Sequence, residues 1–469
     1  MSNSFEKFSQ YLFSFLSDND ARSLSLALSE TKPVVSVRRN SRKTNDFATD
    51  FSPVPWCSKG VYLEDRIPFT FDPLLHAGCY YVQDASSMVY ERIIEFLRPK
   101  FDDLPIKYLD LCAAPGGKTT AALDALHDED FVMANEINPS RAKILAENVA
   151  KWGAANCYIS SVDSARISSM GEFFDIIAVD APCSGEGMMR KDDDAVSQWS
   201  LSLVKECAKR QQEILDNAWF MLAAGGYLIY STCTFNRLEN EEILNYLLSK
   251  HGAESIDLQL ESIGGISRGI NADGFCYRFM PHQTKGEGLF VAVVRKQVGN
   301  QNIKLKSCQP KRGANKLPLP RNVETLLMYP HNYEIKCSED KVTATPKSHL
   351  NIVSHVCNYI NLWNTGVLLG SIKGRDLVPE HSLALSNAFN QDSMPGVDVN
   401  YSTAIAYLRG ETFALPIDTP RGLVRICYEG ITIGFMKNLG SRANTLMQKE
   451  WRIRSTHFLE PASQIVIPV

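Results

Sequence analysis

The feature that most constrains the fold is an alternation of short apolar runs and longer amphipathic segments between residues 105 and 297. The runs have the length of buried strands, and the segments between them have helical spacing. This alternation is typical of a mostly parallel, doubly wound sheet. The sequence therefore predicts an α/β, Rossmann-like domain. The expected strands are KYLDLCAA, DFVMANEI, NCYISSV, FFDIIAVDAP, GGYLIYSTC and LFVAVVRK, and the expected helices are TTAALDALH, PSRAKILAENVAKWG, about 200–222, and NRLENEEILNYLLSKHG.

Other segments lie at the edge of this sheet or outside it. A short polar turn joins FCYRFMP to GLFVAVVRK, which predicts an antiparallel hairpin at the sheet edge. Phe5, Phe8 and Leu12 recur at helical intervals and predict one amphipathic helix over about residues 1–30. We expect an N-terminal α+β cap over 1–95, the sheet domain over 96–297, a linker over 298–321, a small mixed module over 322–390 and a β-rich unit over 391–469.

Composition argues against several classes of protein. No stretch approaches the roughly 18–20 consecutive apolar residues that span a bilayer, and Glu6 and Lys7 interrupt the amino terminus. Twelve cysteines without a C-x-x-C pair indicate neither a zinc ribbon nor a redox dithiol. We therefore expect a cytoplasmic protein without a membrane segment or a metal. The formal net charge of -4 leaves room for local basic patches.

The stretch LDLCAAPGGKTT, Leu109–Thr120, ends like a phosphate-binding P-loop. That loop needs a glycine where this chain has Cys112, so the match fails at the residue that makes the turn. An ATPase is therefore disfavoured. What remains is a strand, a Pro-Gly-Gly turn and a helix, a βα unit whose turn lets a ligand approach the backbone.

Three acidic residues follow successive strands: Glu136, Asp163 and Asp180. The carboxyl ends of parallel strands meet at one edge of a sheet, where ligands bind. A carboxylate after the second strand can accept both ribose hydroxyls, and one after the third can meet an adenine amino group. A nucleoside site without a triphosphate loop points to S-adenosylmethionine.

Two cysteines, Cys183 in DAPCSGEG and Cys233 in YSTCTF, follow strands at the same edge. Carbon 5 of cytosine takes a methyl group only after a thiolate adds to carbon 6, and a base must then remove the carbon-5 proton. The residues alone leave open which cysteine attacks. Lys118, Arg190 and Lys191 are candidates for favouring the thiolate, and Asp180 is a candidate acid near ring nitrogen 3.

Four segments, LDLCAAPGGKT, NEINPSRAKILAENVAKWG, DIIAVDAPCSGEGMMRK and IYSTCTFNRLENEE, resemble in order the motifs of the Sun/Nop family of RNA 5-methylcytosine methyltransferases. The match covers about residues 80–297. With its long C-terminal extension and the PUA-like segment GITIGFMKNLGSRANTLMQKEWRI, the chain is similar to the bacterial RsmF/YebU-type enzymes. The resemblance implies S-adenosylmethionine as cofactor and small-subunit ribosomal RNA as substrate. Transfer RNA, or a non-catalytic RNA-binding assembly factor on the same fold, is the alternative.

The resemblance also implies a role for each matching residue. Cys233 attacks the base, Cys183 promotes release, and Asp180 lies on both the cofactor side and the base side. The ribose is expected on Glu136 and the adenine on Asp163. Met189 stands where the family usually has an aromatic residue. The methionine part of the cofactor is expected along Cys112, Ala113, Ala114, Pro115, Gly116, Gly117 and Lys118.

RNA binding is expected from the flanking regions, because phosphate contacts need positive charge. Eight lysines and arginines and no acidic residue lie between Arg295 and Arg321. Arg38, Arg39 and the basic residues from Arg442 to Arg454 are the other candidates. The target base must be unpaired or flipped out of its helix, and we expect the enzyme to be a monomer.

Overall fold

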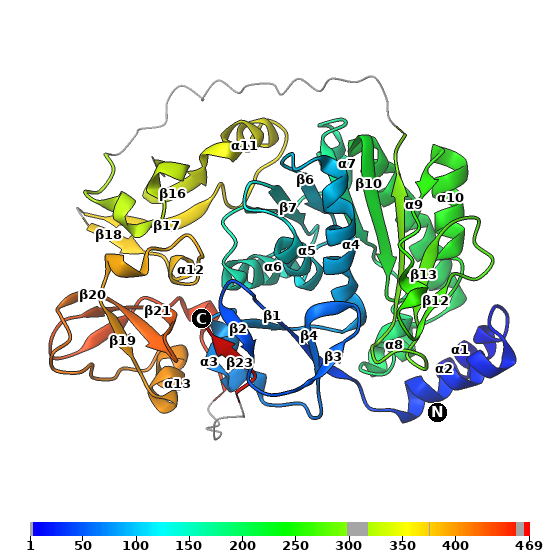
Figure 1. The fold of residues 1–469 in the computed structure, drawn as a ribbon, viewed down its shortest axis with the longest axis horizontal. Helices are drawn as coiled ribbons and strands as arrows, with labels where there is room; N and C mark the ends of the chain where they lie inside the picture. Colours follow the sequence, from blue (N-terminus) through cyan, green and yellow to red (C-terminus); the bar gives the residue numbers. More distant parts are fainter. Residues whose placement is uncertain (1–2, 298–317, 375, 456–463) are drawn as a thin grey trace.

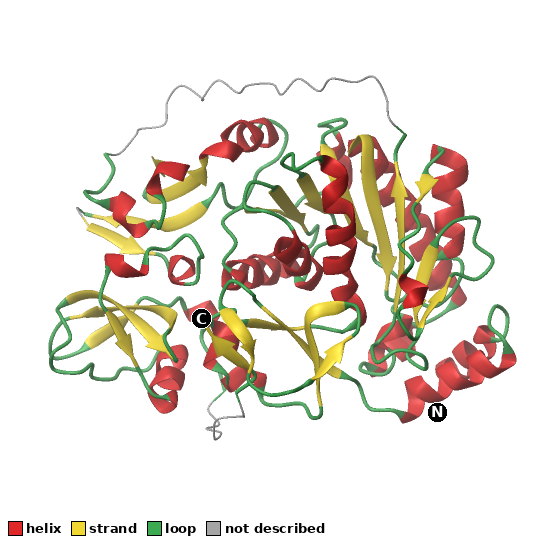
Figure 2. Cartoon of the chain, in the orientation of Figure 1, coloured by secondary structure: helices red, strands yellow, loops and turns green. Residues whose placement is uncertain are grey.

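The protein is described by a computed structural model that places residues 3–297, 318–374, 376–455 and 464–469. A large central sheet is flanked by helices, with smaller sheets along one side (Figures 1 and 2). Among these residues, no helix is both long and apolar enough to cross a membrane.

The central sheet confirms the predicted doubly wound α/β domain. Its strand order is β12-β13-β14-β10-β9-β6-β7-β8, and β11 also pairs with β14. The strands from β10 to β8 are parallel, whereas β13 and β14 form the expected antiparallel hairpin. The strands are β6 (Lys107–Asp110), β7 (Phe131–Asn135), β8 (Cys157–Ser160), β9 (Phe174–Asp180), β10 (Leu222–Thr232), β11 (Glu254–Ser255), β12 (Ile266–Arg268), β13 (Cys276–Phe279) and β14 (Leu289–Arg295).

Helices cover both faces of this sheet with separate apolar cores. One core joins the strands to α4 (Val89–Leu97), α5 (Gly117–Ala125) and α6 (Pro139–Trp152). The other joins them to α7 (Ser164–Ser168), α9 (Leu201–Met221), α10 (Glu241–His251) and α11 (Leu350–Cys357). The sheet is thus buried on both sides, which explains its nearly continuous apolar strands.

Local signals set the ends of these helices. Asn138 caps α6 by accepting hydrogen bonds from the N–H groups of Ser140 and Arg141, and Pro139 occupies the first turn. Gly153 ends the helix at φ 88°, a left-handed conformation that glycine adopts without strain. The start of α6 is thereby fixed directly behind Glu136.

The predicted single N-terminal helix is wrong. The chain forms α1 (Asn3–Leu12) and α2 (Asp18–Glu30), and Ser17 breaks the segment by capping α2 through the N–H of Asp20. The apolar residues pack as expected, because Phe5 and Phe8 join a core with Trp199. A sheet of order β3-β4-β1-β5 completes this region, formed by β1 (Val35–Arg39), β3 (Ser52–Val54), β4 (Cys57–Leu63) and β5 (Tyr80–Val82).

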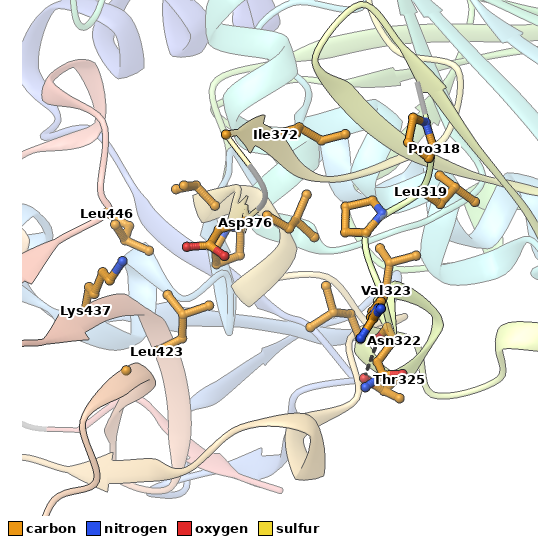
Figure 3. A pocket seen from close by; sticks show the side chains of 18 residues that line it. Pro318, Leu319, Asn322, Val323, Thr325, Ile372, Asp376, Leu423, Lys437 and Leu446 are labelled. Atoms are coloured by element: carbon orange, nitrogen blue, oxygen red, sulfur yellow. Dashed lines mark hydrogen bonds between the residues drawn. The ribbon is translucent and has the colours of Figure 1, made fainter. Parts of the chain in front are cut away.

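Two further sheets form the C-terminal part. The first contains β15 (Tyr333–Ser338), β16 (Lys341–Pro346), β17 (Val367–Lys373) and β18 (Asp376–Pro379), with α12 (His381–Ala384) beside it. Helix α11, between β16 and β17 in the chain, packs instead on the central sheet. The second contains β19 (Gly396–Asp398), β20 (Gly422–Tyr428), β21 (Ile431–Asn438) and β22 (Ala443–Thr445). A cavity of about 1300 Å³ lies where these sheets meet residues 318–326 (Figure 3).

The last unit differs from its predicted content in two respects. Residues 401–409, which we placed in a β-rich stretch, form helix α13 (Tyr401–Arg409). The terminal strand β23 (Val466–Pro468) leaves the unit and pairs with β2 (Thr44–Phe47) of the N-terminal region (Figure 1). Most of the predicted basic linker, residues 298–317, lies outside the described residues.

Candidate active site

The turn after β6 places a backbone loop against the cavity at the sheet edge. Gly116 has φ 111°, and a Cβ there would lie 3.2 Å from Leu145 Cδ1. Glycine therefore suits this turn into α5 both in conformation and in space. Thr119 Oγ1 of α5 donates to Asp110 Oδ2 at 2.7 Å and ties the helix start to the end of β6. Burial raises the pKa of Asp110 to about 7.

A cavity of about 680 Å³ lies at the carboxyl ends of the parallel strands. Of the predicted loop, Cys112 and Ala114 line it, Ala113 is buried, and residues 115–118 are not part of the lining. The predicted residues Glu136, Asp163, Asp180, Cys183 and Cys233 all line it. The structure thus brings the strand-end acids and both cysteines to one cavity.

The three acids differ in their surroundings. Glu136 is 3% exposed, accepts the N–H of Asn138 at 3.0 Å, and faces Arg141 at 3.5 Å. Asp163 caps α7 (Ser164–Ser168) by accepting the N–H of Ala165 at 2.8 Å. Asp163 therefore has a local structural role in addition to its place in the cavity. A buried carboxylate and an exposed carboxylate thus share one cavity, which is large enough for the nucleoside part of S-adenosylmethionine.

Asp180 is held from both sides. Lys118 Nζ donates to Asp180 Oδ2 at 2.7 Å, and Ser231 Oγ donates to Oδ1 at 2.7 Å. Tyr90 supports this arrangement through a hydrogen bond to Ser231 at 2.8 Å. Burial lowers the pKa of the Lys118 ammonium, but the negative charge and hydrogen bond of Asp180 outweigh it, so the net pKa is raised. Lys118 is therefore a charged ammonium at neutral pH.

The two cysteines are in direct contact. Cys183 Sγ and Cys233 Sγ lie 3.3 Å apart, although their loops follow different strands. The hydrogen bond to Cys233 and burial raise the pKa of Cys183 well above the ordinary range. Cys183 is thus a thiol that can donate a hydrogen bond to Cys233. The ammonium group of Lys118 interacts electrostatically with Cys233.

Arg190 and Lys191, predicted as possible activators of a thiolate, have another partner. Arg190 Nε donates to Glu287 at 2.9 Å, and Lys191 Nζ lies 3.3 Å from the same carboxylate. Neither residue lines the cavity. Lys118 is not part of the lining either, but it pairs with Asp180, which is, so of the three candidate cations Lys118 is the one placed next to the site.

Sequence reasoning missed the polar residues that α9 contributes to the cavity. Arg210, Glu213 and Asn217 line it together with Ile214. Their spacing of three to four residues places them on one face of the helix. The spacing of these residues could be seen in the sequence, but nothing there indicated that their face of α9 points to the carboxyl ends of the strands.

The predicted RNA contacts also have mixed outcomes. The prediction that Arg38 contacts RNA is wrong. Its guanidinium group is fully buried, pairs with Asp124, and donates a hydrogen bond to Gln83 at 2.9 Å. Arg39 is partly buried and donates to the carbonyl of Thr44 at 3.3 Å. Arg442 and Arg454 are exposed.

Three family models match this chain. The model for 16S rRNA methyltransferase RsmB/F matches residues 94–295. The models for the N-terminal domain of 16S rRNA methyltransferase RsmF and for the methyltransferase RsmF PUA domain match residues 6–85 and 395–453. The three matches follow each other along the chain in the order of its structural regions.

Similar proteins extend this result. The ribosomal RNA small subunit methyltransferase F of Shewanella baltica is 30% identical, over 88% of this chain and 90% of its own. The protein of that name from Serratia proteamaculans is 38% identical, over 54% of this chain and 52% of its own.

Solved structures share the fold. A methyltransferase homolog protein from Pyrococcus horikoshii has a TM-score of 0.52 and 24% identity, over 63% of this chain and 100% of its own. NSun6 from Pyrococcus horikoshii, solved with SFG, has a TM-score of 0.51 and 20% identity, over 61% of this chain and 97% of its own.

Proposed function

Because the chain belongs to the ribosomal RNA small subunit methyltransferase F family, and is thus an S-adenosylmethionine-dependent rRNA methyltransferase, we propose that it methylates carbon 5 of a cytosine. We propose that residues 96–297 of the chain form the catalytic domain. The observation that carries the proposal is the pair of sulfur atoms, 3.3 Å apart, in the same cavity as Glu136 and Asp163.

S-adenosylmethionine, when bound, supplies an electrophilic methyl group. We assign its ribose to Glu136, its adenine to Asp163 and its methionine part to Cys112 and Ala114, the two residues of the predicted loop that line the cavity. A carboxylate that already accepts a backbone N–H, as Glu136 does, is fixed in place to receive hydroxyl donors.

We assign the attack to Cys233. Its sulfur forms a bond to carbon 6 of the cytosine, and the electron pair of the 5,6 double bond makes carbon 5 nucleophilic toward the methyl group. Lys118 favours this step, because a nearby ammonium stabilises a thiolate. We assign Asp180 to ring nitrogen 3, where negative charge develops during the addition, and propose that it delivers to this nitrogen a proton drawn from its hydrogen-bonded partner, the Lys118 ammonium.

We assign release to Cys183. After methylation a base removes the carbon-5 proton, the 5,6 double bond forms again, and the bond between sulfur and carbon 6 breaks with its electron pair returning to sulfur. A thiol at 3.3 Å can donate a hydrogen bond to the departing Cys233 thiolate. The high pKa of Cys183 keeps that thiol protonated.

The RNA substrate is proposed to be a single-stranded or flipped-out cytosine of small-subunit rRNA, because a thiolate cannot reach carbon 6 inside a base stack. Cys233→Ala is expected to abolish 5-methylcytosine formation, measured by mass spectrometry of digested rRNA. Cys357→Ala is the matched control, because that cysteine is exposed on α11. Full activity of Cys233→Ala would contradict the assignment.

A further inference from the structure

Two loops carry the cysteines. Each loop contains a buried glutamate that accepts hydrogen bonds from the other loop. The β9 loop (residues 181–192) carries Cys183, and the β10 loop (residues 233–240) carries Cys233. Glu186 of the first loop and Glu239 of the second are both fully buried. A buried carboxylate is costly unless its oxygens accept hydrogen bonds, so their partners are informative.

Glu239 accepts four hydrogen bonds. Its Oε2 receives the N–H of Ser184 at 3.0 Å and Gln211 Nε2 at 2.8 Å. Its Oε1 receives Ser184 Oγ and, at 2.8 Å, Asn236 Nδ2. Two of these four bonds come from the residue directly after Cys183. Glu239 therefore fixes the backbone next to Cys183 and, with it, the position of the Cys183 thiol.

Glu186 fixes the loop that carries Cys233 in the same way. It accepts the N–H groups of Phe235 at 2.6 Å and Asn236 at 2.9 Å, just beyond Cys233. The N–H of Gly187 donates to the carbonyl of Cys233 at 2.7 Å, and a Cβ at Gly187 would lie 2.5 Å from that oxygen. The separation of the two sulfur atoms is thus set by contacts from both loops.

Glu239 also acts on Cys183 through its charge. Its negative charge adds to the hydrogen bond from Cys233 and to burial in raising the pKa of Cys183. Burial raises the pKa of Glu239 itself to about 7. The titratable groups that face Glu239 are Glu186, Cys183, Cys207 of α9, Tyr230 of β10 and Tyr11 of α1.

We propose that Glu239 is a positioning residue for product release: it holds Cys183 beside Cys233 and preserves Cys183 as the thiol that donates to the departing sulfur. This inference rests on the proposed roles of the two cysteines. It assigns to Glu239 an effect on release that is separate from cofactor binding, because Glu239 does not line the cavity.

The first test is Glu239→Gln. All four hydrogen bonds to Glu239 come from donor groups, so the new amide NH₂ faces donors and the Ser184 backbone is released. We expect turnover to fall by about tenfold to a hundredfold and an RNA–protein adduct to accumulate on a denaturing gel, with the KM for S-adenosylmethionine unchanged. Glu242→Gln is the matched control, because Glu242 lies exposed on α10 and pairs with Arg237.

A second readout separates positioning from general stability. Without the Glu239 charge the pKa of Cys183 falls, so the protonated thiol is lost at lower pH. The alkaline limb of the release rate is therefore expected to move to lower pH in Glu239→Gln. Glu239→Asp keeps the charge but shortens the side chain, so it is expected to accumulate adduct without moving that limb.

The outcomes are distinct. Turnover at the wild-type level, or loss of turnover without adduct, overturns the role of Glu239. If Glu239→Gln does not fold, Glu239→Asp decides by the same adduct measurement. Cys183→Ala serves as reference: if it forms adduct and neither Glu239 variant does, the positioning role fails while the two-cysteine mechanism stands. If Cys183→Ala forms none, the mechanism itself fails.

Discussion

The N-terminal region and the C-terminal unit are both rich in basic residues, but they use them differently. In the N-terminal region Arg38 pairs with buried Asp124, and Lys43 Nζ donates to three backbone carbonyls. In the C-terminal unit the side chains of Arg442 and Arg454 make no hydrogen bond or ion pair with any described residue. Arg38 and Lys43 hold regions of the protein together, whereas Arg442 and Arg454 are the candidates for binding phosphate groups.

Replacing a buried cation should give the largest effect. Arg38→Met leaves Asp124 as an uncompensated buried charge, so we expect the free energy of unfolding to fall by about 3–5 kcal/mol. Chemical denaturation measures this. Arg42→Met is the control, because its ion pair with Asp128 is partly exposed and is expected to contribute at most about 1 kcal/mol. Equal effects of the two variants would contradict the contrast.

The stability of the protein should be sensitive to acid through His381 of α12, a helix that packs against β21 of the C-terminal unit. Burial, followed by the positive charge of Lys151, lowers the pKa of His381 to about 3. Below pH 6.5 the unfolded chain binds a proton that the folded chain excludes, so stability falls as the pH decreases toward 3. Between pH 6.5 and 5 the expected loss is about 2 kcal/mol.

His381→Phe should remove this part of the pH dependence, measured by denaturation at several pH values. His331→Phe is the control, because His331 is exposed. An acid limb that stays the same in His381→Phe would show that His381 is not its source.

The exposed arginines should give the smallest effect. We expect Arg442→Ala with Arg454→Ala to weaken rRNA binding about tenfold and to reduce the salt slope by about 1 for each phosphate that is no longer neutralised. Binding of S-adenosylmethionine should not change. Arg42→Ala is the control from the N-terminal region. Unchanged RNA affinity in the double variant would exclude this surface from RNA binding.

Point substitutions are a better test of whether the C-terminal unit binds RNA than removal of residues 391–469. The apolar core of the C-terminal unit includes Val37 and Val61 of the N-terminal region, and β23 pairs with β2. Deletion would expose that shared core, so a loss of RNA binding could arise from unfolding.

The sequence predicted the sheet edge well, because strands and their ends follow from local periodicity. Glu136, Asp163 and Asp180 could be placed together from their positions after parallel strands. The burial of Arg38 could not be predicted, because it depends on Asp124 of a helix that is 86 residues away. Composition describes a charge, whereas burial and pairing decide its use.

Two other features of the structure could not be predicted from the local sequence pattern. The break between α1 and α2 depends on a single cap at Ser17, within a segment whose apolar spacing predicts one helix. The network around Glu239 joins loops after two different strands, and NRLENEE by itself indicates only the start of an acidic helix. Long-range contacts of this kind leave no period in the sequence.

The most direct test of the account is an adduct measurement. Cys183→Ala, expressed in cells, is expected to give a nuclease-sensitive band on a denaturing gel that is heavier than the protein. That band should disappear when Cys233→Ala is added, and sequencing the trapped RNA would identify the target as small-subunit rRNA or another RNA. A band that persists without Cys233 would contradict the central claim that Cys233 forms the bond to the cytosine.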